Sequence, residues 1–137
     1  MSARVVYADA EPGGLGSMLG GLIEQNLERD PTRERLLTPT LVSIEAPDAH
    51  VSVTLRIDPG RVLVSDGLRL EAQLAISADA ARLLALTDAP LRFGLPDPLR
   101  AQGRAILADV FSRRVRIRGM ISHPRRLAHL TMLLSVR

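Results

Sequence analysis

The chain has 137 residues, which suits a single domain, and its 46% apolar and 24% charged residues are ordinary for a globular protein. Its net charge is +3 and every basic side chain other than histidine is arginine, so the absence of lysine and cysteine excludes Schiff-base chemistry, disulfides and thiolate sites. No apolar run approaches the ~18 residues of a membrane-spanning helix, and without a targeting signal we expect a cytoplasmic protein.

The N-terminal third is predicted to be helical after a flexible tail. We assign residues 1–14 to the tail and residues 15–137 to one domain. Apolar residues then recur at helical spacing. They are Leu15, Met18, Leu19, Leu22, Ile23 and Leu27. Gly20 and Gly21 interrupt this stripe at a cost of about 1 kcal/mol each relative to alanine, so packing stabilises the helix or a close neighbour requires the glycines. Asp30-Pro31 starts a short second helix through Leu37.

After residue 39, apolar residues recur at every second position, which predicts strands over residues 40–46, 50–58, 61–65 and 68–76. The turns Asp58-Pro59-Gly60 and Asp66-Gly67 separate the last three of these segments. Short alternating strands joined by such turns are typical of an antiparallel meander with one buried face.

The second half of the chain predicts three more helices and a fifth strand. Ser77 is a suitable cap for a helix over residues 78–88, and Asp97-Pro98 begins another that extends to about residue 113. The segment "RVRIRG", residues 114–119, is a strand that points Val115 inward and its arginines outward. A last helix follows Pro124. The resulting fold class is α+β: a five-stranded, mostly antiparallel sheet with helices packed on one face.

No signature of catalysis or metal binding emerges from the sequence. The histidines are His50, His123 and His129, and the last two lie six residues apart, which separates them widely around a helix. Neither a G-x-S-x-G elbow nor a glycine-rich phosphate motif with a preceding strand is present. We therefore expect no catalytic residues, no metal and no cofactor, and we expect that the protein is not an enzyme.

Aliphatic side chains say more about function than the polar residues do. The last helix is apolar over a wider arc than contact with one sheet face needs, so it is either buried on two sides or lines a cavity or an interface. Pockets for apolar ligands are lined by such side chains. The candidate ligand-binding residues are Leu83, Leu84, Phe93, Leu107, Phe111, Met120, Leu127 and Leu130.

Residues 50–86 and 114–134 together resemble the sterol carrier protein 2 domain. The matching features are Asp66-Gly67 after the strands, Ser77-Ala78-Asp79 at a helix start and the strand that ends at Gly119. The resemblance covers about residues 15–136, although the helix over residues 99–113 is longer than the usual connection. It implies an apolar tunnel for a sterol, fatty acid, acyl-CoA or isoprenoid or quinone-type lipid. It also implies a non-enzymatic carrier, or a module of a larger lipid or quinone system.

Three kinds of partner are compared: an anionic membrane, nucleic acid and a second copy of the chain. Residues 1–99 carry nine arginines and fourteen acids, a net −5, whereas residues 100–137 carry nine arginines and Asp109, a net +8. Transient contact with anionic membrane would use six arginines of the basic end. They are Arg113, Arg114, Arg116, Arg118, Arg125 and Arg126. Nucleic acid is disfavoured because three Phe and Tyr residues form no stacking platform, and a homodimer through excess apolar surface stays open.

Overall fold

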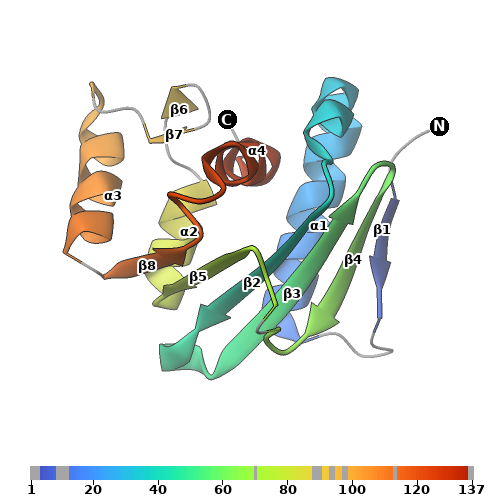
Figure 1. The fold of residues 1–137 in the computed structure, drawn as a ribbon, viewed down its shortest axis with the longest axis horizontal. Coiled ribbons are helices and arrows are strands. Elements are labelled where there is room, and N and C mark those ends of the chain that lie inside the picture. The colour runs from blue at the N-terminus through green and yellow to red at the C-terminus, as the bar shows by residue number, and fades with distance from the viewer. Residues whose placement is uncertain are drawn as a thin grey trace.

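The computed structural model describes residues 4–8, 13–69, 71–87, 91–92, 95–96, 99–112 and 114–135. Six strands form one mixed sheet in the order β1-β4-β3-β2-β5-β8 (Figure 1). These strands are β1 (Arg4–Tyr7), β2 (Thr40–Ala46), β3 (Val51–Asp58), β4 (Arg61–Asp66), β5 (Leu74–Ala78) and β8 (Val115–Arg118). The helices are α1 (Gly14–Arg29), α2 (Ala80–Thr87), α3 (Ala101–Phe111) and α4 (Pro124–Leu134), with 3₁₀ helices η1 (Pro31–Leu36) and η2 (Pro47–Ala49). A separate two-stranded sheet pairs β6 (Leu91–Arg92) with β7 (Leu95–Pro96).

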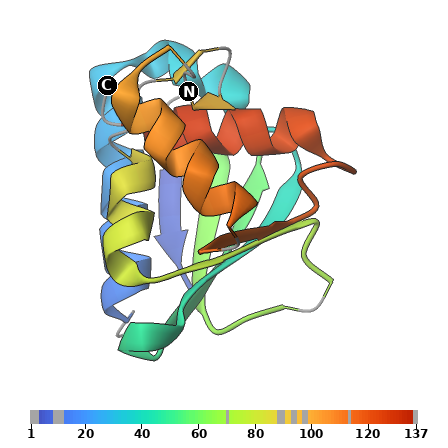
Figure 2. The same ribbon diagram turned by 90° about the vertical axis from the view of Figure 1, so that its left-hand side faces the viewer.

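The predicted α+β class and the placement of helices on one sheet face are confirmed (Figure 2). β2, β3 and β4 form the expected antiparallel meander, in which Val42 faces Leu55 and Leu55 faces Val64. These three side chains are fully buried beneath the helices because every second residue of each strand points inward. The sheet is mixed, however, since β5 runs parallel to β2 and β1 runs parallel to β4.

The sixth strand corrects the prediction that residues 1–14 are a flexible tail. Arg4–Tyr7 pairs in parallel with β4, and Val5 and Tyr7 pack against the core. The segment "RVVY" is rich in residues that favour strands, but four residues are too few to give a clear period of two. Its position depends on contacts with β4 and α1 that are distant in sequence.

The segment predicted as a strand over residues 68–76 is a strand only from Leu74 onward. The preceding residues 67–69 and 71–73, here called the strap, connect β4 to β5 across the outer face of the sheet. The Thr54 hydroxyl donates to the Gly67 carbonyl at 2.8 Å, and the Arg69 N–H donates to the Ser43 hydroxyl at 3.0 Å. This covering explains why two polar residues on the outer face of the sheet, Ser43 and Thr54, are buried. A hairpin at Asp66-Gly67 was therefore a wrong prediction.

Two glycines in α1 have different surroundings. A Cβ at Gly20 would lie 2.5 Å from the Tyr7 hydroxyl oxygen, whereas a Cβ at Gly21 would meet nothing within 4 Å. We expect Gly21→Ala to raise the free energy of unfolding by up to about 1 kcal/mol through helix propensity. Gly20→Ala should instead be less stable than Gly21→Ala by at least about 1 kcal/mol, because the Tyr7 ring must shift from its place against the core. Urea denaturation of both variants measures the difference, and equal stabilisation would show that Tyr7 does not require the glycine.

Candidate functional site

A small apolar cavity lies between the helices and the inner face of the sheet. Its volume is about 40 Å³, and α1, α2, α4, β2 and β5 all contribute to its wall. The lining residues are Leu19, Ile44, Ile76, Leu83, Leu130, Thr131 and Leu134. Thr131 is the one polar residue among them, and its hydroxyl donates to the Ala128 carbonyl at 2.9 Å. The cavity therefore suits hydrocarbon and offers a ligand almost no polar contact.

A second apolar hollow opens at the surface between α1 and α2. This groove has a volume of about 170 Å³ and no polar lining atoms. It is lined by Gly14, Leu15, Met18, Ala46, Val51, Ala80, Leu83 and Leu84. Met18 and Leu84 keep 37% and 51% of their surface exposed, which is unusual for large apolar side chains in neighbouring positions. Leu83 is buried and lines both the groove and the cavity, so the two hollows meet at this residue.

The start of α2 fixes the groove wall. β5 continues through Ala78, so the predicted cap at Ser77 was wrong and Asp79 precedes the helix instead. The Asp79 carboxylate accepts the Arg82 N–H at 2.8 Å and also pairs with the Arg82 guanidinium. The backbone N–H of Arg82, together with its guanidinium, lowers the pKa of Asp79, so this capping carboxylate stays ionised to a lower pH than a free aspartate does. The Ala80 N–H donates to Asp48 at 3.1 Å, which joins α2 to η2.

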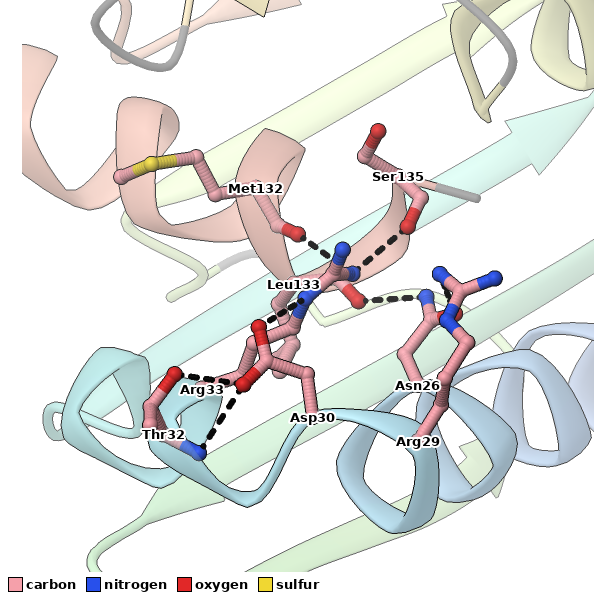
Figure 3. Close-up of polar contacts among 8 residues, drawn as sticks. All are labelled: Asn26, Arg29, Asp30, Thr32, Arg33, Met132, Leu133 and Ser135. Atoms are coloured by element: carbon pink, nitrogen blue, oxygen red, sulfur yellow. Dashed lines mark hydrogen bonds and ion pairs between the residues drawn. The ribbon is translucent and has the colours of Figure 1, made fainter. Parts of the chain in front are cut away.

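Helix α4 forms one wall of the interior cavity, and its C-terminal end is held by side chains from α1 and η1 (Figure 3). Buried Asn26 donates from Nδ2 to the Leu133 carbonyl at 2.9 Å. Arg33 donates to the carbonyls of Met132 at 3.1 Å and Ser135 at 2.6 Å. The last carbonyls of a helix have no partner within the helix, and these donors satisfy three near the end of α4. The wall that carries Leu130 and Leu134 is therefore firmly anchored.

Asp30 in turn positions Arg33. Its carboxylate lies 3.6 Å from Arg33 Nε and accepts hydrogen bonds from the side chain and the backbone of Thr32, as Figure 3 shows. The Thr32 hydroxyl, with Arg33 adding to its effect, lowers the pKa of Asp30. These contacts serve structure, because Asp30 caps the start of η1 and Arg33 binds carbonyls at the end of α4.

The three histidines do not converge on a reactive centre. His129 Nδ1 lies 3.4 Å from the Thr38 hydroxyl, and burial together with Arg125 and Arg35 lowers the pKa of His129, so its ring is neutral at pH 7. His123 Nδ1 lies 3.0 Å from an Arg126 nitrogen at the start of α4. Within the described part of the chain, no three His, Asp or Glu side chains are grouped closely enough to hold a metal ion.

The structure separates the predicted ligand-binding residues. Leu83, Leu84 and Leu130 line the groove or the cavity, and Leu127 is buried in the core. Met120 instead lines a groove on the outer face of the sheet, where it follows Gly119 in the turn between β8 and α4. Leu107 is half-buried on α3. Phe93 and the side chain of Phe111 lie outside the described residues.

Sequence reasoning missed the contribution of α1 and the sheet to this site. Leu19, Met18 and Ile44 line it, but each belongs to an apolar pattern that core packing already explained. The sequence carried no separate signal for them, because the exposure of Met18 becomes visible only in the structure.

Within the described residues, no helix is both long and apolar enough to cross a membrane. No protein-family model matches the sequence, and no curated protein matches it. Similarity appears at the level of solved structures. A chain described as "UbiJ-SCP2 Ubiquinone synthesis protein" aligns with a TM-score of 0.60 and 20% identity, over 88% of this chain and 96% of that one.

The chain has the sterol carrier protein 2-like fold. This alignment confirms, for the fold, the resemblance seen in the sequence. The sterol carrier protein 2-like sheet has six strands here, one more than expected. A solution structure from Thermus thermophilus, described as that of a conserved hypothetical protein and candidate sterol carrier, aligns with a TM-score of 0.45 and 13% identity, covering 96% of this chain and 92% of that one.

Proposed function

We propose that this domain binds a hydrophobic small molecule of the fatty-acyl, sterol or isoprenoid class, without chemically converting it. The observation that carries the proposal is the apolar groove between α1 and α2, which meets the interior cavity at Leu83. An apolar chain that enters this path gains roughly 25 cal/mol for each Å² of apolar surface removed from water. The fold, and its similarity to a structure described as a ubiquinone synthesis protein, support a lipid-like ligand.

Binding requires the groove to widen. Pockets that enclose a small molecule typically measure about 300–1,000 Å³, whereas the groove and the cavity have volumes of about 170 and 40 Å³. Because Asn26 and Arg33 anchor α4 at its C-terminal end, we propose that α2 moves outward and that the Leu83 side chain rotates. The ligand chain would then occupy the space between Leu19 and Leu130.

Native mass spectrometry tests this function. The protein, as purified and after incubation with palmitate or a sterol, should show a bound species whose added mass equals one ligand. A protein that carries no lipid and takes none up would contradict the proposal.

A protein-interaction or oligomerisation module is the alternative that the exposed Met18 and Leu84 allow. Light scattering at micromolar concentration separates the two functions. A stable dimer that takes up no lipid would mean that the groove is an interface between chains.

A further inference from the structure

We propose that the outer face of the sheet docks on anionic bilayers through the turn between β8 and α4, residues 119–122. This surface lies on the side of the sheet opposite to α1 and α2, as Figure 2 shows for both the turn and the strap. It is therefore separate from the proposed ligand groove. The inference goes beyond ligand binding and does not depend on it.

The turn presents apolar side chains to water. Ile121 keeps 90% of its surface exposed, and Met120 keeps 37%. Leu68 of the strap is also exposed and lines the same outer-face groove as Met120. Exposed aliphatic side chains that gather in this way mark a binding surface more often than a solvated one. Their position at the tip of a turn suits insertion between lipid headgroups.

A broad groove of about 610 Å³ adjoins this tip on the outer face. Its polar lining is dominated by arginine. The lining residues are Ser43, Glu45, Leu68, Arg69, Ala75, Ile76, Ser77, Val115, Arg116, Ile117, Arg118 and Met120. Arg116 and Arg118 project from β8 because alternate residues of that strand face outward, opposite Val115. Phosphate-bearing headgroups suit a groove that presents guanidinium groups.

The charges around the tip favour an anionic partner. Arg69, Arg116 and Arg118 line the groove and Arg125 lies four residues after Ile121, while the acidic residues nearby are Glu45 and Glu71. Four positive and two negative side chains leave a net charge of +2 on this surface. Each arginine close to an anionic bilayer contributes roughly a five-fold gain in binding.

The other predicted membrane arginines serve different contacts. Arg114 lies 3.7 Å from the Asp109 carboxylate, and Arg126 donates to the Pro39 carbonyl at 3.3 Å. Arg113 lies outside the described residues. Arg118 donates to the Ala72 carbonyl at 3.2 Å, which holds it beside the strap. Arg116 and Arg125 are therefore the better positions for substitution.

Vesicle flotation tests the proposal. The wild-type protein should float with vesicles of equimolar phosphatidylglycerol and phosphatidylcholine and not with phosphatidylcholine alone. Ile121→Ser should weaken this binding at least about five-fold. The matched control is Leu99→Ser, since Leu99 is 70% exposed but lies before α3. Equal losses for the two variants would overturn the role of the tip.

The charge contribution is tested in the same assay. Arg116→Gln combined with Arg125→Gln should weaken binding about 25-fold, at five-fold for each arginine. Arg100→Gln combined with Arg104→Gln removes the same charge from exposed positions at the start of α3 and should have a small effect, and added salt should weaken wild-type binding. Equal flotation with anionic and neutral vesicles would overturn the proposal. So would competition by free glycerol phosphate, which would reveal a site for a small anion.

These outcomes are distinguishable from those of the ligand site. Ile121→Ser should leave palmitate uptake in vesicle-free solution unchanged, because Ile121 does not line the groove or the cavity. Loss of both activities in a folded variant would contradict the separation of the two surfaces.

Discussion

Replacing Gly119 with alanine is expected to lower the free energy of unfolding by about 3 kcal/mol or more. Gly119 has a φ of +89°, which L side chains rarely adopt. A Cβ there would also press into the backbone carbonyl oxygen of Gln73, and that carbonyl belongs to the strap. The strap cannot move away easily, because the Gln73 N–H donates to the Leu41 carbonyl and the Gln73 side chain accepts the Leu41 N–H, both at 2.9 Å.

Gly60→Ala is the matched control for this substitution. Gly60 has a similar φ of +80°, but a Cβ there would meet nothing within 4 Å. It should therefore cost only the conformational penalty of roughly 1–2 kcal/mol. Urea denaturation of both variants separates the penalty for φ from the penalty for close packing. If the two variants lose the same stability, the contact between Gly119 and the strap does not constrain the fold.

Filling the mouth of the groove should strongly weaken ligand binding with little loss of stability. Ala80 is a small residue at the start of α2 that lines the groove beside Met18 and Leu84. We expect Ala80→Trp to occupy the path that leads to Leu83 and to lower the affinity for a fluorescent fatty acid at least about ten-fold, or 1.4 kcal/mol. Because Ala80 is only half-buried, the change in unfolding free energy should stay within about 1 kcal/mol.

Ala81→Trp provides the control, since Ala81 is exposed on α2 and does not line the groove. It adds the same surface and should leave fatty-acid affinity unchanged. A similar loss in both variants would point to a general effect on α2. Unchanged affinity in Ala80→Trp would show that the ligand does not pass between α1 and α2.

Local patterns in the sequence were sufficient to predict most elements. Within the predicted stripe, Leu15, Leu19, Ile23 and Leu27 form the buried face of α1, whereas Met18 is exposed. The alternation in β3 matches the side chains of Val53 and Leu55 that point into the core. Both patterns arise because each element has one face in the core and one in water, and the spacing of its apolar residues shows which face is buried. The strand β8 was predicted for the same reason, with Val115 buried.

Long-range pairing was not predictable in the same way. The alternation of "LRLEAQ" predicts a strand, yet residues 68–69 and 71–73 belong to the strap, where the Arg69 backbone is hydrogen-bonded to the Ser43 side chain. The strand β1 needs β4 and the space left by Gly20, which no local pattern reveals. Likewise, Leu83 was predicted as a ligand residue from composition, but its position between two hollows depends on how α1 and α2 pack against the sheet.

The most direct test of the central claim is a titration of the wild-type protein with a fluorescent fatty acid, followed by displacement with unlabelled palmitate. The proposed groove predicts saturable binding of one fatty acid per chain, competitive displacement by palmitate and loss of the signal in Ala80→Trp. Fluorescence that does not saturate, or that palmitate does not displace, would contradict the claim that the space between α1 and α2 is a binding site for a hydrophobic molecule.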